Sequence, residues 1–335
     1  RQRQMCIRDK HHLGDFLDHK DFAALETLSR GIREILRNII RARNEMLPMG
    51  KRMANLDGDF TVCKVYKILL QREGRYLQDI IATGGYDVLN EQTVNNVISL
   101  DLVTMRYTVL DPMINPRKSH ATAMLDGKLF VMGGVNEYDY ECDVLSSVEC
   151  LDLETGQWSE MAPMITPRCN HSSAVLGGKI YVTGGEINAM VIKSVESYDP
   201  ATNQWTAETP MDTRRVDHVM VSAQGKLFVV GGRHPRKGGL RSVKCFDPST
   251  GVWSKIAPLG TARKFFAMAV LGNKLYAIGG QSSYYRPLSS VECLDLSVPN
   301  SEWTTVAPMT LPRFGMEAVV TGGKIYIAGG YGLSS

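Results

Sequence analysis

Short apolar strands and glycine turns alternate along most of the chain, from about residue 75 to residue 335. In 171–185 and in 267–280, an apolar run, a glycine turn and a second apolar run lead to two adjacent glycines. Two alternating runs joined by a short glycine turn are typical of a β-hairpin. The preceding segment differs, because its apolar residues from Phe22 to Ile40 recur every three to four positions, which predicts an amphipathic helix.

The adjacent glycines mark an internal repeat of about 50 residues. Each pair follows a short apolar strand, where a missing Cβ lets strand backbones crowd and lets the chain leave at unusual φ. Six pairs share this position: Gly84 and Gly85, Gly133 and Gly134, Gly184 and Gly185, Gly231 and Gly232, Gly279 and Gly280, and Gly329 and Gly330.

A second motif follows each of the middle four pairs. Ser-Val-Glu-x-x-Asp occurs at 147–152, 194–199 and 290–295, and Lys244 replaces the glutamate at 242–247. A turn and an aromatic residue come next, Tyr107 in the first unit and then Trp158, Trp205, Trp253 and Trp303. A further short strand completes each unit. Four antiparallel strands in a period of about 50 residues predict a propeller blade, in which the tryptophans pack between blades.

This combination of diglycine, Glu-x-x-Asp and Trp resembles the kelch motif, and the resemblance covers about 75–335. It implies an all-β kelch propeller, a fold that commonly closes with six blades. The first unit shows three strands and could take a fourth from 61–70, whereas the last unit shows only 317–320 and 324–328. We therefore expect a six-bladed ring truncated at its C-terminal end, with a five-bladed ring as the alternative.

The segment before the propeller is divided as follows. Residues 1–10 look like a non-native artefact, 11–50 form a helical segment, 51–75 a linker and 76–335 the propeller. The stretch 13–30 resembles the second half of an F-box, with an aspartate-rich turn, Asp-Phe-x-x-Leu and Ser29-Arg30. Two alternatives stay open: a bare helical appendage packed on the propeller, or the end of the helical domain that precedes kelch rings in BTB proteins.

Charge and cysteine content narrow the class of protein. The net charge is +3, and Lys and Arg form no long blocks, so we expect no nucleic-acid partner. The longest apolar run, 265–271, is too short to span a membrane as a helix, so we expect no membrane partner. Seven cysteines without a Cys-x-x-Cys pair argue against a disulfide framework. A reducing, cytoplasmic compartment, with the nucleus as a further option, is therefore expected.

Catalytic and metal sites are not indicated. His120, His171 and His218 occupy one repeat position, which spreads them over three blades, and Cys150, Cys245 and Cys293 share a strand position. The sequence contains no nucleophile elbow, phosphate loop or His-Glu-x-x-His motif. We expect no catalytic residues, no metal and no cofactor.

Binding chemistry is concentrated in the loops that follow the diglycines, which vary in length and charge. The loop at 136–141 is acidic and aromatic, whereas the loops of blades four and five are basic and aromatic. We expect five of their residues to form one protein-binding patch: Arg233, Arg236, Tyr284, Tyr285 and Arg286. The kelch resemblance adds repeated arginines that would line the channel mouth and grip acidic peptides, namely Arg117, Arg168, Arg215, Arg263 and Arg313. The alternative for this series is that it satisfies carbonyls and carboxylates between blades.

These observations favour a non-catalytic protein-interaction module. The resemblance implies a substrate-recognition adaptor of a cullin-RING ubiquitin ligase. Its propeller would hold a protein substrate, such as an acidic or phosphorylated peptide, and its helices would dock a Skp-type adaptor and cullin. The alternatives are a kelch-scaffold enzyme (an oxidase or a sugar-modifying enzyme) and an actin or cytoskeletal scaffold.

Overall fold

The computed structural model describes residues 64–72, 75–87, 92–101, 107–138, 141–321 and 323–332. Within these ranges every regular element is a β-strand. They contain no helix of the length and hydropathy that a membrane span needs. The predicted artefact at 1–10 and the helical segment at 11–50 lie outside the described residues, so the F-box resemblance stays a prediction.

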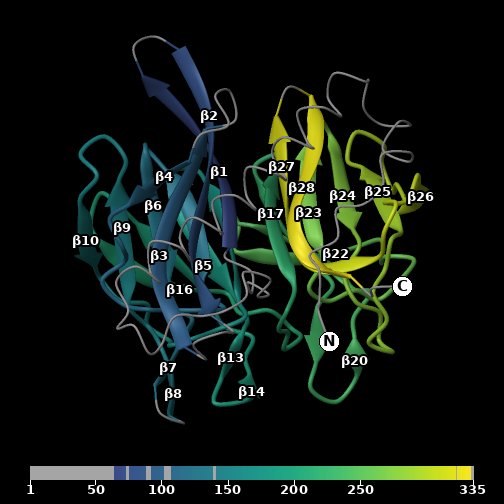
Figure 1. Ribbon diagram of the computed structural model, residues 1–335. Helices are drawn as coiled ribbons and strands as arrows, with labels where there is room; N and C mark the ends of the chain where they lie inside the picture. Colours follow the sequence, from purple (N-terminus) through teal and green to yellow (C-terminus); the bar gives the residue numbers. More distant parts are fainter. Residues whose placement is uncertain are drawn as a thin grey trace, which may run out of the picture.

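Five sheets of four antiparallel strands form the first five blades (Figure 1). Blades one and two consist of β1 (Lys64–Arg72), β2 (Arg75–Asp87), β3 (Gln92–Asp101) and β4 (Tyr107–Leu110), then β5 (Ala121–Leu125), β6 (Lys128–Met132), β9 (Val148–Asp152) and β10 (Trp158–Met161). Blade three consists of β11 (Ser172–Leu176), β12 (Lys179–Thr183), β15 (Val195–Asp199) and β16 (Gln204–Glu208).

The remaining blades repeat this order. Blade four consists of β17 (Val219–Ala223), β18 (Lys226–Val230), β21 (Val243–Asp247) and β22 (Val252–Ile256). Blade five consists of β23 (Ala267–Leu271), β24 (Lys274–Ile278), β25 (Val291–Asp295) and β26 (Thr304–Val306). The sixth sheet contains the two predicted strands, β27 (Arg313–Thr321) and β28 (Lys324–Gly332).

The six sheets meet as a ring. The first strand of each sheet contacts the first strand of the next, from β1 through β5, β11, β17 and β23 to β27, and β27 in turn contacts β1. The option that 61–70 supplies a strand to blade one is confirmed, because β1 pairs with β2 over Lys64–Arg72. The linker predicted at 51–75 is therefore corrected at its C-terminal end, since 64–72 belong to the propeller.

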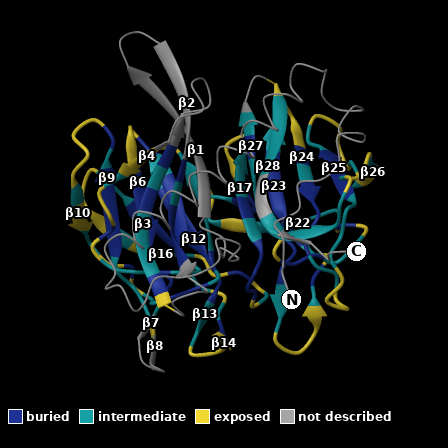
Figure 2. Cartoon of the chain, viewed as in Figure 1, coloured by how far each residue is buried: buried dark blue, intermediate teal, exposed yellow. Residues whose placement is uncertain are grey.

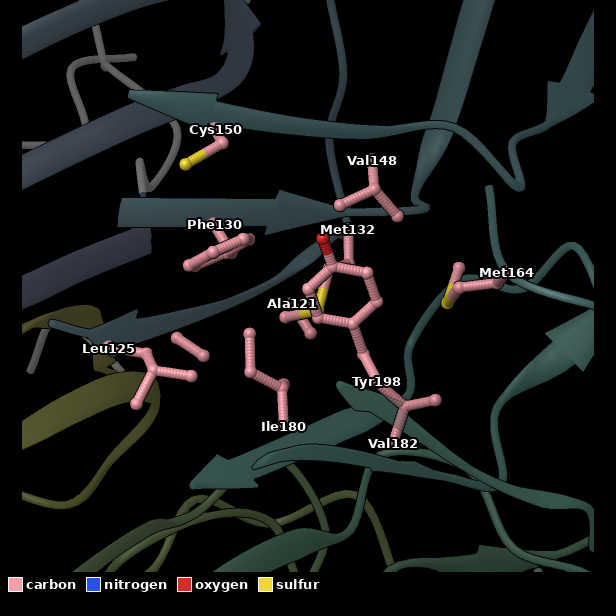
Figure 3. Close-up of a cluster of buried hydrophobic side chains, with 11 residues drawn as sticks. Ala121, Leu125, Phe130, Met132, Val148, Cys150, Met164, Ile180, Val182 and Tyr198 are labelled. Atoms are coloured by element: carbon pink, nitrogen blue, oxygen red, sulfur yellow. The ribbon is translucent and has the colours of Figure 1, made fainter. Parts of the chain in front are cut away.

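Apolar side chains from neighbouring blades form shared buried clusters. Exposed residues lie in turns, in loops and on the last strand of each four-stranded blade (Figure 2). Figure 3 shows the interface of blades two and three, where Phe130 and Ile180 meet Tyr198. The ring centroids of Phe130 and Tyr198 lie 5.7 Å apart, and the ring centroid of Trp205 lies 5.2 Å from that of Tyr198. Large rings at such distances contribute both buried area and a favourable edge geometry. Each blade thus completes its core only against its neighbour.

The repeated tryptophans tie each blade to the blade before it. The indole Nε1 of Trp205 donates a hydrogen bond of 2.8 Å to the carbonyl of Ala162, which follows the outer strand of blade two. The other three indoles make the same bond one blade away: Trp158 to Asp111, Trp253 to Thr209 and Trp303 to Ala257. A half-buried ring with a satisfied N–H explains why Trp suits this position.

The diglycines lie where the backbone passes closest to the next blade. Gly184 has φ +58, and a Cβ added there would lie 2.5 Å from the carbonyl oxygen of Arg215. A side chain at this position would therefore meet both a backbone penalty and a clash. The chain turns away after Gly185 and enters the loops described next.

Candidate functional site

The loops after the diglycines leave the propeller on one face. Three of them form short ribbons: β7 (Val135–Tyr138) with β8 (Glu141–Val144), β13 (Glu186–Ile187) with β14 (Met190–Val191), and β19 (Arg233–His234) with β20 (Gly238–Gly239). These ribbons project together at the bottom of Figure 1. An isolated antiparallel β-bridge holds the start of each of three loops. The bridged pairs are Cys169 with Glu186, Val216 with Arg233, and Lys264 with Gln281.

A chain of backbone hydrogen bonds joins successive blades on this face, and we call its five residues the rim: Ser119, Asn170, Asp217, Phe265 and Gly315. The N–H of each residue donates to the carbonyl of the previous one, with distances of 2.9, 3.2, 3.1 and 2.7 Å from Asn170 onward. All five have positive φ. The rim is therefore a hydrogen-bonded backbone framework next to which the loops begin.

Charged side chains follow the rim from blade three to blade five. The Asn170 amide donates to Glu186 at 2.9 Å, and Glu186 lies 3.8 Å from the Arg233 guanidinium. The Arg233 Nε lies 3.4 Å from Asp217, whose side chain is 2% exposed. Burial raises the pKa of Asp217 to about 6, although Arg233 opposes the shift. The Lys264 ammonium lies 3.8 Å from the centre of the Tyr285 ring, a cation–π contact.

The structure brings the loops of blades four and five together. A Cβ added to Gly239 would lie 2.6 Å from the Ser283 hydroxyl, so the two loops touch. A tight turn, closed by the Tyr285 N–H to Ser282 carbonyl bond of 3.0 Å, holds Tyr284 and Tyr285 at the loop tip. These rings are 85% and 69% exposed. Two exposed aromatic residues side by side are unusual on a surface that has no binding role.

The basic residues of the expected patch lie on the same two loops and differ in exposure. Arg236 and Arg286 are exposed, whereas Arg233 is half-buried and engaged by Asp217 and Glu186. Arg233 therefore contributes its charge to the patch but is partly neutralised. We refer to Arg236, Tyr284, Tyr285 and Arg286 as the basic-aromatic patch.

Four of the five repeated arginines lie beneath the surface, which corrects their assignment to the channel mouth. Arg168 is fully buried and donates to the carbonyls of Gly184 and Ser194 and to the carboxylate of Glu196. A guanidinium without exposed area cannot contact a partner. The same holds for Arg117, which pairs with Glu149, for Arg263, which pairs with Glu292, and for Arg215. Arg313 is half-buried, and burial lowers its pKa.

Blade four departs from this scheme. Lys244 stands where the other blades have glutamate, and it donates instead to Asp212 at 2.5 Å. Arg215 thus lacks the carboxylate acceptor of its counterparts and bonds to the carbonyls of Gly231 and Ser242. Burial lowers the pKa of Arg215 to about 10, and Asp212 partly opposes this shift.

Two of the repeat histidines bond to threonine hydroxyls, and the cysteines at the shared strand position are buried free thiols. His120 and His218 bond through Nε2 to the hydroxyls of Thr83 and Thr183, at 2.9 and 2.8 Å. Burial raises the pKa of the Cys150 thiol to about 11, which disfavours the nucleophilic thiolate. Among the described residues, no three His, Cys, Asp or Glu side chains are grouped so that they could hold a metal ion.

Sequence reasoning missed three rim-side residues: Asp217, Lys264 and Phe265. Their signal is available in the repeat register, because the position two residues after the repeated arginine holds Ser, Asn, Asp, Phe and Gly in turn. All of these except Phe tolerate positive φ well or are small. Aligning the repeats on the arginine therefore marks Phe265 as the exception.

Comparison with known proteins identifies the fold. The family model described as the Attractin/LZTR1 β-propeller matches residues 80–334. The chain belongs to this propeller family. An Influenza virus NS1A-binding protein homolog of Xenopus laevis is 48% identical over 77 residues, which are 23% of this chain and 11% of that protein. An F-box/kelch-repeat protein of Arabidopsis thaliana is 29% identical over 118 residues, 35% of this chain and 28% of that protein.

A solved structure supports the same architecture. The structure of YjhT matches with a TM-score of 0.66 and 16% identity, over 82% of this chain and 92% of that one. At this identity the match shows the fold alone. The kelch resemblance is confirmed by the family model, this fold and the kelch-repeat relative. The chain matches about a tenth to a quarter of the length of the two relatives.

Proposed function

We propose that this propeller recognises a protein partner through the basic-aromatic patch. The observation that carries the proposal is the pair Tyr284 and Tyr285, 85% and 69% exposed, on a loop that touches the equivalent loop of blade four. Tyrosine and arginine are enriched among the few residues that dominate binding energy at protein interfaces, because they present large apolar area or forked donors. The blade-strand framework holds both loops on one rigid face.

The charge of the patch favours an acidic or phosphorylated segment. Arg236, Lys237 and Arg286 are exposed on the two loops, and the sequence between Arg233 and Arg241 contains no carboxylate. Arginine forks onto carboxylates and phosphates with paired hydrogen bonds. The exposed Asp143, after the acidic loop of blade two, would repel such a segment and confine it to blades four and five.

The finer proposal is a substrate-recognition adaptor of a cullin-RING ubiquitin ligase in the cytoplasm. It rests on the resemblance of 13–30 to an F-box and on the F-box/kelch-repeat relative. In this proposal the helical segment contacts a Skp-type adaptor, and the propeller holds the substrate. The buried free thiols of Cys150, Cys169, Cys245 and Cys293 suit a reducing compartment.

The binding face is tested by comparative affinity capture. The variant Arg236→Ala/Arg286→Ala removes two positive charges from the patch. The matched control, Lys179→Ala/Lys274→Ala, removes two exposed charges from the opposite ends of the blade strands. We expect proteins captured by the parent and by the control to be depleted by the patch variant, with all three melting alike. Equal capture by the patch variant would show that the face has been assigned wrongly.

The ligase proposal has a separate test. The full chain is mixed with a purified Skp-type adaptor and cullin, and complex formation is followed by size-exclusion chromatography. We expect a complex that is lost when 11–50 are deleted and kept in the patch variant. Absence of a complex with the full chain would remove the ligase proposal but leave the partner-binding proposal intact.

A further inference from the structure

Phe265 has a backbone conformation that an aromatic residue rarely adopts. Its φ is +51, held by the rim bonds from its N–H to the Asp217 carbonyl and from the Gly315 N–H to its own carbonyl. The other rim positions carry Ser119, Asn170, Asp217 and Gly315. A bulky side chain at positive φ is strained, and such strain is concentrated at functional sites. Blade five therefore carries a costly residue where a small one would satisfy the same bonds.

Packing in the core does not account for this residue. The Phe265 side chain is 37% exposed and belongs to none of the five buried clusters between blades. Its ring lies 6.5 Å from the ring of Phe314, the neighbour of the next rim residue. Two aromatic residues from adjacent blades thus form an apolar spot on the same face as the loops.

A lysine lies beside this apolar spot. The Lys264 ammonium is 5.6 Å from the centre of the Phe265 ring and 3.8 Å from that of Tyr285. Lys264 is 6% exposed, and burial lowers its pKa although the charge of Asp217 opposes the shift. No described carboxylate lies within ion-pair distance of Lys264, because Asp217 makes its ion pair with Arg233. Aromatic faces only partly replace water around an ammonium group.

We propose that Phe265, Phe314 and Lys264 form an anchoring subsite that receives an apolar side chain of the protein partner, adjoining an acidic residue of the same segment. This inference rests on the proposed function and specifies the partner's chemistry. The acidic neighbour follows from desolvation. An apolar side chain that covers the two phenylalanine rings also removes water from Lys264. An anion must then offset the lost hydration of the ammonium group. Tyr285 links the subsite to the basic-aromatic patch, so one segment could reach both.

The test uses three fluorescein-labelled heptapeptides and fluorescence anisotropy. The first has tryptophan between two triplets of glutamate, the second replaces the tryptophan with glycine, and the third replaces the glutamates with glutamine. For the parent chain we expect the first peptide to bind at least about tenfold more tightly than either of the others, which is about 1.4 kcal/mol.

The variant Phe265→Asn copies the residue of blade three, which tolerates positive φ. We expect it to bind the tryptophan and glycine peptides equally and to melt no lower than the parent, because relief of strain offsets the lost contacts. The control Val298→Asn removes an exposed apolar residue from a distant turn and should keep the tryptophan preference. A preference retained in Phe265→Asn, or a markedly lower melting temperature, would overturn the subsite.

A second measurement needs no variant. With benzoylphenylalanine in place of tryptophan, irradiation of the parent complex should cross-link the peptide within 264–265 or at Phe314. Cross-links confined to other blades would refute the placement. If the parent binds the tryptophan and glycine peptides equally, only the subsite fails. If it binds neither acidic peptide, recognition of an acidic segment fails, and the subsite with it.

Discussion

Asp217 should make the propeller less stable at neutral pH than in mild acid. Its side chain is 2% exposed, and among the described residues its Oδ1 has no hydrogen-bond partner. Burial raises its pKa to about 6 from an ordinary value of 3.8. Because the folded pKa is raised, the stabilising contribution of the protonated carboxyl is complete below about pH 4 and is lost as pH rises through about 6.

The size of the effect follows from the shift. A difference of about two pKa units, at about 1.4 kcal/mol each, corresponds to about 3 kcal/mol of folding free energy lost by pH 7.5. Asp217→Asn imitates the neutral carboxyl, and asparagine occupies the same rim position in blade three with φ +51. The variant should therefore be more stable than the parent by about 1 to 3 kcal/mol at pH 7.5, the lower figure applying if the amide is left partly unsatisfied.

Urea unfolding at pH 4.5 and pH 7.5 provides the assay. We expect the parent and Asp217→Asn to differ most at pH 7.5 and to differ by less than half as much at pH 4.5. Asp247→Asn is the control of opposite sign, because bonds from Ser249 and Lys226 lower the pKa of Asp247. Its variant should lose stability to the same extent at pH 7.5 and pH 4.5, because the lowered pKa of Asp247 lies below both values. A pH-independent difference between the parent and Asp217→Asn would refute the reasoning about Asp217.

Three further substitutions test the framework. Arg168→Ala should lower the free energy of unfolding by about 3–5 kcal/mol in urea titrations, since it strands a buried carboxylate; an effect below about 1 kcal/mol would mean that the arginine is not buried. Lys244→Glu should raise the free energy of unfolding by about 1 kcal/mol, because it gives Arg215 the carboxylate acceptor that other blades provide. A lower free energy of unfolding would contradict this prediction. Gly184→Ala should melt well below Gly178→Ala, because both have positive φ but only Gly184 has a backbone oxygen 2.5 Å from the added Cβ; equal melting would exclude the clash.

The sequence predicts the ring because each blade repeats the same residues in the same order. The hairpins, the glycine pairs and the tryptophans act within about 50 residues of chain, so their spacing is visible without a structure. The contact of the loops of blades four and five was also predictable, since equivalent loops of neighbouring blades emerge on one face.

The repeated arginines were harder to interpret. Arg168 and the patch residue Arg236 each directly follow a proline. Arg168 is nevertheless fully buried, whereas Arg236 is exposed. The partner of Arg168 is Glu196, in the second motif of the following unit, and only the three-dimensional register shows that they meet. The rim residues were missed because composition does not show positive φ; only alignment of the repeats on the arginine marks their shared position.

The binding of a captured partner to purified protein tests the central claim most directly. Isothermal titration should show that Arg236→Ala/Arg286→Ala raises the Kd about a hundredfold, a cost of about 3 kcal/mol. The melting temperature should stay within a degree of the parent, and Lys179→Ala/Lys274→Ala should bind like the parent. If the patch variant binds its partner as tightly as the parent, the loops of blades four and five are not the recognition surface.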